Sequence, residues 1–126
     1  MRVLVVEDSA LVRKMYGLAF PRREHELTAV ENGRIALTAI AESQQPYDLI
    51  LLDLRMPDMD GVEFIRAVRS NVALARLPIV LTTAEPEGSD LMLQAKALGV
   101  AAVVRKPWNP QELRDVVRAV LHKPVG

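Results

Sequence analysis

The chain has 126 residues, enough for one domain that buries roughly two-thirds of its unfolded surface on folding. Half of the residues are hydrophobic and 25% are charged, which is typical of a soluble globular protein and excludes a disordered one. Lysine plus arginine equals aspartate plus glutamate at 16 each, so no global positive charge attracts nucleic acid or an anionic membrane. Cysteine is absent, which excludes disulfides, thiolate metal sites and cysteine nucleophiles.

The first residues, MRVLVVED, have too few apolar side chains before the acids for a signal peptide or a membrane span. No repeat, low-complexity tract or linker interrupts the sequence that follows. We therefore expect a cytoplasmic protein that makes no contact with a membrane, with residues 1–126 forming a single domain.

Apolar segments of strand length alternate with segments of helical spacing along the chain. The apolar segments predict five strands, at residues 3–6, 27–30, 49–52, 79–81 and 101–104. Residues with capping side chains predict where the intervening helices begin: Ser9, Asn32, Ser89 or Asp90, and Asn109. Gly99 is a plausible end for the fourth helix.

The last helix has the clearest pattern. Its apolar residues recur at the spacing of one helix face: Leu113, Val116, Val117, Val120 and Leu121. Pro110 suits the first helical position, and Pro124 predicts the end of the helix.

Five strands that alternate with five helices predict an α/β fold, a three-layer αβα sandwich with right-handed crossovers and a parallel sheet. The periodicity does not give the strand order. Among the doubly wound folds, the five-stranded flavodoxin-like order 2-1-3-4-5 suits a chain of this length. Ligands of such sheets bind at the carboxyl ends of the strands, so the residues that follow each strand are the candidates for a site.

Polar side chains follow four of the five predicted strands: Glu7, Asp8, Asp53, Thr82, Thr83 and Lys106. Clustered carboxylates favour a hard cation such as Mg²⁺, whereas lysine and a threonine hydroxyl suit the oxygens of a phosphoryl group. An aspartate beside a metal can also act as a nucleophile and form an aspartyl-phosphate. Each of these residues alone has an ordinary structural interpretation, but their joint position on one rim favours a site.

Asp53 is the most informative of these residues, because four aliphatic residues lead directly into it. Such a run predicts a strand that is buried on both faces, and a carboxylate at its end is costly unless it is paired or binds a metal. We interpret Asp53 as a residue that is exposed at the rim to be modified.

Four segments of the chain, VLVVEDS, LLDLRMPDMDG, TTAE and RKPW, resemble the signature segments of bacterial response-regulator receiver domains, the CheY-like family. The resemblance covers essentially the whole chain and implies the CheY-like strand order 2-1-3-4-5. It implies that Asp53 accepts a phosphoryl group from the phosphohistidine of a histidine kinase or a histidine phosphotransfer protein. It also implies that Gly61 opens the third helix.

The resemblance implies further roles around Asp53. Glu7, Asp8 and Asp53, with the backbone carbonyl of Arg55, would hold Mg²⁺, for which Mn²⁺ can substitute. Thr83 would bond a phosphoryl oxygen, since Thr82 lies one place too early, and Lys106 would bind the phosphate. The Lys106–Pro107 peptide bond is expected to be cis.

Some positions bear on regulation. Arg55 and Glu85 each lie two residues after a site residue, so we expect their opposite charges to meet across the mouth of the site. Val103 stands where many members carry a rotating tyrosine or phenylalanine, and Trp108 stands where phenylalanine often follows the Lys-Pro pair. A valine has no ring and few rotamers, so we expect the signal to pass through residues 84–88 and the start of the fourth helix.

We therefore expect a phosphorylation-activated signalling switch, which is not a metabolic enzyme and changes its surface for a downstream protein. The alternative is a pseudo-receiver, an unphosphorylated interaction module with the same fold. These 126 residues contain no recognisable DNA-binding or enzymatic output domain, so no direct contact with nucleic acid is expected. Both a stand-alone receiver and the receiver of a longer regulator agree with this sequence.

Overall fold

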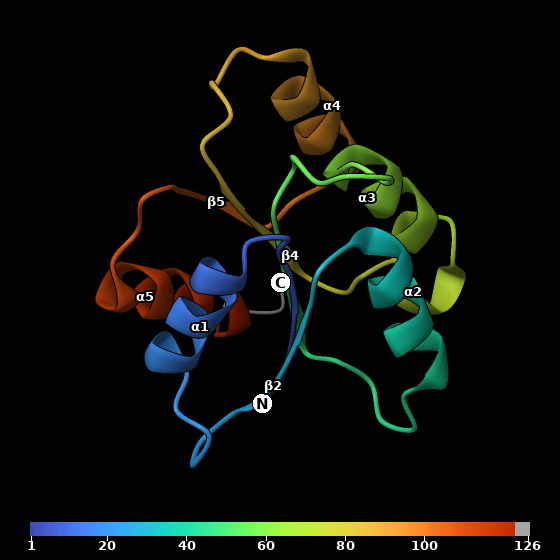
Figure 1. Cartoon of the computed structure of the whole chain (residues 1–126). Coiled ribbons are helices and arrows are strands. Elements are labelled where there is room, and N and C mark those ends of the chain that lie inside the picture. Colours follow the sequence, from blue (N-terminus) through green and yellow to red (C-terminus); the bar gives the residue numbers. More distant parts are fainter. Residues whose placement is uncertain (123–126) are drawn as a thin grey trace.

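The computed structural model describes residues 1–122 as a five-stranded parallel sheet with helices on both faces (Figure 1). The strands are β1 (Arg2–Val6), β2 (Glu26–Val30), β3 (Leu49–Leu52), β4 (Ile79–Thr83) and β5 (Ala102–Arg105). The helices are α1 (Ala10–Ala19), α2 (Gly33–Glu42), α3 (Gly61–Arg69), α4 (Asp90–Leu98) and α5 (Pro110–Leu121), with a short 3₁₀ turn η1 (Val72–Leu74). The strand order is β2-β1-β3-β4-β5, which confirms the predicted topology.

Helices α1 and α5 cover one face of the sheet, and α2, α3 and α4 cover the other (Figure 1). Alternate side chains of β3 pack into the apolar clusters on opposite faces of the sheet. Leu49 and Leu51 pack in the apolar cluster beneath α1 and α5, whereas Ile50 and Leu52 pack in the cluster beneath α2, α3 and α4. All four side chains are fully buried, as the apolar run predicted.

Two strands differ from the predicted ranges near the candidate site. β4 extends two residues further, to Thr83, and β5 begins and ends one residue later than expected. The extension forms because Thr82 and Thr83 are β-branched and pair with Val104 and Arg105 of β5. Both threonines therefore belong to the sheet rather than to the loop that follows it.

The predicted helix starts are confirmed by their capping bonds. The side chains of Ser9, Asn32, Ser89 and Asn109 each accept a hydrogen bond from the backbone N–H three residues ahead. Gly99 ends α4 with a φ of +99°, a conformation that favours glycine. Helix α5 reaches Leu121, and Pro124, the predicted stop, lies outside the described residues.

The start of α3 is packed directly against the segment that follows Asp53. The Gly61 N–H donates to the carbonyl of Leu54 at 2.8 Å, and Asp60 caps the helix by accepting from the N–H of Glu63. A Cβ atom at Gly61 would lie 2.7 Å from the Leu54 Cα, so only glycine fits there. This contact holds the loop between Asp53 and α3 against the first residue of the helix.

None of the helices in residues 1–122 has both the length and the apolar character needed to cross a membrane.

Candidate functional site

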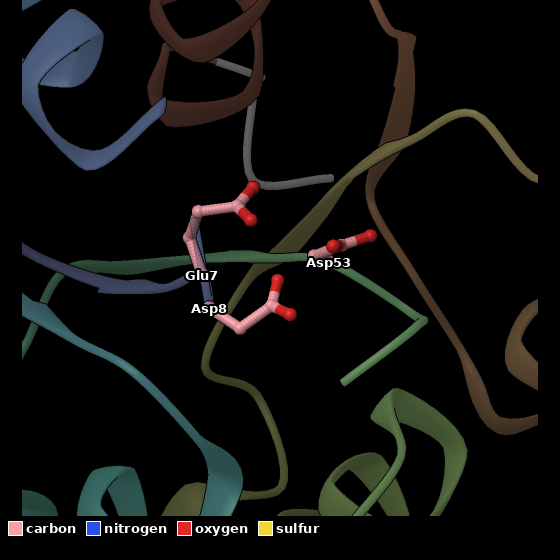
Figure 2. Close-up of side chains that lie close together, drawn as sticks. All are labelled: Glu7, Asp8 and Asp53. Carbon is pink, nitrogen blue, oxygen red and sulfur yellow. The ribbon is translucent and has the colours of Figure 1, made fainter. Parts of the chain in front are cut away.

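Three carboxylates gather where β1 and β3 end (Figure 2). Glu7 and Asp8 follow β1, Asp53 follows β3, and these strands are neighbours in register up to Val6 and Leu52. One oxygen from each carboxylate lies within 4.8 Å of the others. Glu7 and Asp53 are only 1% and 6% exposed, whereas Asp8 faces solvent. Oxygen ligands with an open side suit a hard divalent cation, so these residues fit Mg²⁺.

Lys106 brings a positive charge to this cluster from the loop after β5. Its Nζ donates to Glu7 Oε1 at 2.6 Å and to Asp53 Oδ2 at 3.2 Å. The lysine side chain is long enough to reach past the end of β4, the strand that separates β5 from β3. The ammonium group of Lys106 thus bridges two carboxylates, and one of them, Glu7, lies 99 positions away from it in the sequence.

The charges of the cluster are only partly balanced. Burial raises the pKa of Asp53 above its usual value, and the nearby Lys106 ammonium offsets part of this effect. Burial likewise raises the pKa of Glu7, against the hydrogen bond from Lys106. For Lys106, burial acts to lower the pKa, but its contacts with Glu7 and Asp53 outweigh burial and raise it. Additional positive charge would therefore favour the ionised carboxylates.

Thr83 lies at the end of β4, next to the strand that carries Asp53. Its side chain is buried, and its Oγ1 accepts a hydrogen bond from the backbone N–H of Glu85 at 3.0 Å. This bond ties the hydroxyl to the loop between β4 and α4. A shift of the Thr83 side chain would therefore be transmitted to that loop.

Arg55 and Glu85 form the ion pair that the sequence predicted. Arg55 Nε donates to Glu85 Oε2 at 2.8 Å, and the terminal nitrogen NH2 donates to Oε1 at 3.1 Å. The Arg55 side chain is 72% exposed and that of Glu85 is 7% exposed. The hydrogen bond from Arg55 lowers the pKa of Glu85, so the carboxylate stays ionised. The pair joins the loop after β3 to the loop after β4.

A second group of contacts behind the site was not predicted from the sequence. The hydroxyls of Tyr16 in α1 and Thr82 in β4 share a hydrogen bond of 2.5 Å. The Tyr16 ring also packs on Trp108, with the ring centroids 4.8 Å apart. The helical spacing of Tyr16 from Val12 and Ala19 could have indicated an inward-facing side chain, but this spacing does not identify the partner.

Three further expectations from the sequence concern Pro107, Arg55 and Val103. The Lys106–Pro107 peptide bond is cis, as expected. Arg55 follows Asp53 by two residues, and its backbone N–H is 3.4 Å from Asp53 Oδ1. Val103 is half-buried beneath the α2, α3 and α4 layer and lies in β5 opposite Leu81.

Comparison with known proteins places this geometry in a family. Residues 3–118 match the model of the response regulator receiver domain. The regulatory protein AtoC of Escherichia coli is 35% identical over 120 residues, which cover 95% of this chain and 25% of AtoC. The chain spans about half or less of the length of the curated relatives it matches.

Solved structures agree with this assignment. The chemotaxis protein CheY4 of Vibrio cholerae has a TM-score of 0.85 and 32% identity, covering 95% of this chain and 98% of CheY4. The phosphorylated cyanobacterial phytochrome response regulator RcpA has a TM-score of 0.78 and 26% identity, covering 94% of this chain and 89% of that chain. Receiver domains of this kind are signalling modules of two-component systems rather than metabolic enzymes, and bind Mg²⁺ in an acidic pocket. The chain belongs to the response regulator receiver domain family.

Proposed function

We propose that this chain is a phosphorylation-activated switch in which Asp53 accepts the phosphoryl group. The observation that carries this proposal is the position of Asp53, which ends a fully buried strand beside two further carboxylates and is bonded by Lys106. A carboxylate in such a place is costly in a purely structural role. Held on a rigid strand with an oxygen facing the rim, it is suited to act as a nucleophile.

In the proposed reaction a carboxylate oxygen of Asp53 attacks the phosphorus of a phosphohistidine. A new P–O bond forms, the P–N bond to the donor breaks, and the imidazole leaves with the electron pair. In the separate hydrolysis that removes the group, a water oxygen attacks the phosphorus, the P–O bond to Asp53 breaks, and the Asp53 carboxylate and inorganic phosphate are released. The chain contributes mainly position and charge neutralisation around the transferred group.

Glu7, Asp8 and Asp53 would hold Mg²⁺ or Mn²⁺, together with the backbone carbonyl of Arg55. When bound, the ion supplies positive charge that screens the carboxylates from the incoming phosphoryl oxygens. Lys106, which bonds both Glu7 and Asp53, supplies a second positive charge, and its raised pKa keeps it protonated. The Thr83 hydroxyl would donate to a phosphoryl oxygen while its Oγ1 still accepts from the N–H of Glu85, so that the loop after β4 follows it.

The donor would be a histidine kinase or a histidine phosphotransfer protein, and the response would be a changed surface for a downstream protein. RcpA, one of the similar structures, is a response regulator that was solved in its phosphorylated form. Relatives such as the DNA-binding response regulator MtrA are about twice as long as the part that this chain covers. Contacts of such longer proteins with DNA are therefore not assigned to these 126 residues.

The experiment is phosphorylation by acetyl phosphate, followed by intact mass. With Mg²⁺ present the wild-type chain should gain one phosphoryl group, and Asp53→Asn should lower the labelling rate by more than about 100-fold. Removing the metal with a chelator should lower the labelling rate of the wild type to a similar extent. The acyl-phosphate linkage to Asp53, a mixed anhydride, also predicts loss of the label in alkali.

Asp58→Asn is the matched control, because Asp58 is an exposed acid in the same loop. Its φ of 71° suits asparagine as well as aspartate. This variant should label at the wild-type rate. Labelling of Asp53→Asn at that rate would contradict the proposal, and a wild-type chain that never labels would favour the pseudo-receiver alternative.

A further inference from the structure

Tyr16 lies at a junction of three segments that carry site residues. It belongs to α1, which begins directly after Glu7, Asp8 and the cap Ser9. Its hydroxyl bonds Thr82, the neighbour of Thr83 in β4. Its ring packs on Trp108, two residues after Lys106.

A contribution to stability does not explain the hydrogen bond between Tyr16 and Thr82. Tyr16 and Thr82 are both fully buried, and Tyr16 packs in an apolar cluster that contains Val5, Leu51 and Val80. A phenylalanine and a valine would fill similar space without two hydroxyls to satisfy. The hydrogen bond instead orients α1 relative to β4, because it fixes the distance and angle between the two hydroxyl groups.

The environment keeps Tyr16 in the form that can make this bond. Burial raises the pKa of Tyr16 far above its usual value, and the negative charges of Glu7 and Asp53 add to the shift. The phenol is therefore neutral near neutral pH, so its hydroxyl can both donate and accept a hydrogen bond.

We infer that Tyr16 is a positioning residue for phosphoryl transfer: through Thr82 and Trp108 it sets the end of β4 and the loop after β5 relative to the carboxylates at the end of β1. Thr83 and Lys106 then face Asp53 at the separation that the transferred group requires. Tyr16 itself does not touch the phosphoryl group. This inference rests on the proposed function of Asp53, and deepens it.

The metal ligands follow β1 and β3, whereas Tyr16 contacts Thr82 in β4 and Trp108 after β5, which predicts a divided effect. Tyr16→Phe should leave the Mg²⁺ affinity within about twofold of the wild type and slow the maximal labelling rate by acetyl phosphate by about three- to tenfold. Tyr47→Phe is the matched control, because Tyr47 is the other tyrosine of the chain and lies against Arg2 at the opposite end of the sheet. It should label at the wild-type rate.

The double variant Tyr16→Phe with Thr82→Val separates positioning from stability. Each single variant strands one buried hydroxyl and should lower Tm, whereas the double variant removes both hydroxyls and should recover Tm. The labelling rate, measured well below Tm, should stay low in all three. The sole tryptophan, Trp108, gives a second signature: Tyr16→Phe should alter its emission change upon binding beryllofluoride with Mg²⁺.

The possible outcomes distinguish the role of Tyr16 from the proposed phosphorylation of Asp53. A wild-type chain that takes no phosphoryl group overturns both. A wild-type chain that labels normally while Tyr16→Phe labels at the same rate overturns the role of Tyr16 alone. A double variant whose rate recovers together with its Tm shows that the pair acts only through stability, which also overturns the inference.

Discussion

Thr82 and Thr83 follow one another at the end of β4, yet their hydroxyls have opposite surroundings. Thr82 points beneath α1 and α5, where its hydroxyl is bonded by the side chain of Tyr16. Thr83 points to the other face, where its hydroxyl is bonded by the N–H of Glu85, within the loop that follows it. One threonine is therefore tied to another layer of the fold, and the other only to its own loop.

This difference separates a fixed side of the site from an adaptable side. On the fixed side, Tyr16, Thr82 and Trp108 are buried and packed together. On the adaptable side, Arg55 is largely exposed and its pair with Glu85 joins two loops. Loops held by few buried contacts move at lower cost than packed layers. A switch needs both, since the fixed side orients the chemistry and the adaptable side changes shape.

Removing the Thr83 hydroxyl should have the largest effect on the conformational response. Thr83→Ala should still accept a phosphoryl group at Asp53, yet lose most of the amide chemical-shift changes in residues 84–88 and the start of α4. The reason is that the hydroxyl is the only group of Thr83 that can follow a phosphoryl oxygen and draw the loop with it. The measurement compares amide spectra with and without beryllofluoride and Mg²⁺.

Val103→Ala is the control for this prediction. Val103 is half-buried beneath α4 but has no ring that can swing into space vacated by Thr83. Its truncation should leave the response of α4 largely intact. The assignment of the adaptable side is wrong if Val103→Ala silences the α4 shifts while Thr83→Ala leaves them unchanged.

A smaller effect is expected from the Arg55–Glu85 pair, which joins the loop after β3 to the loop after β4 on the adaptable side. We expect it to hinder the water that removes the phosphoryl group, so charge reversal of either residue should change the dephosphorylation rate by roughly tenfold or less. The effect is bounded because the Arg55 side chain is 72% exposed and its interactions are screened. The check is the decay of labelled protein after removal of acetyl phosphate.

The double reversal, Arg55→Glu with Glu85→Arg, sharpens this prediction because it restores the pair with its ends exchanged. A rate near that of the wild type would assign the effect to pairing, whereas an additive change would assign it to each charge separately. Unchanged rates in both single variants would exclude a charged gate.

The smallest effect concerns stability and asks how well the fixed side neutralises Asp53. Since the pKa of Asp53 is raised, the folded protein binds this proton more tightly than the unfolded chain does, and ionisation costs stability. In metal-free protein Asp53→Asn should therefore stabilise by about 1 kcal/mol near neutral pH. For a domain of this size that corresponds to about 4 °C in Tm.

The pH dependence gives the sign of this prediction. The gain should be complete above the raised pKa of Asp53 and should fade as the pH falls toward its usual value near 4, because the wild-type side chain then becomes neutral too. Saturating Mg²⁺ should reverse the order, since it binds the wild type more tightly. Thermal melts in chelator and in Mg²⁺ measure both arms, and a variant that is less stable at neutral pH without metal would show that Lys106 neutralises Asp53 fully.

The rim of the site was predictable because it depends on short-range patterns. Apolar runs mark where β1 and β3 end, and parallel strands bring their carboxyl ends to one edge, so Glu7, Asp8 and Asp53 had to lie close together. The strand order came from the resemblance and from the chain length, because periodicity holds no information about which strands are neighbours. The extension of β4 to Thr83 was missed because the aliphatic run stops at Leu81.

The contacts of Tyr16 with Thr82 and Trp108 could not be predicted from the sequence, for a different reason. Whether Tyr16 meets Thr82 depends on the rotation of α1 about its axis and on its height above the sheet, and both follow from the packing of the whole layer. Helical spacing identifies Tyr16 as an inward-facing residue without naming its partner. The link between Lys106 and Glu7 was likewise invisible, since a flexible lysine can reach several acids.

The ammonium of Lys106 sets the charge balance of the rim. Glu7, Asp8 and Asp53 bring three negative charges when ionised, and Lys106 cancels one, which leaves a deficit of two. A divalent ion restores neutrality, whereas a monovalent ion leaves a net negative charge at the site that repels an approaching phosphate. The valence of the ion that suits this site is thus determined by a residue that does not bind it.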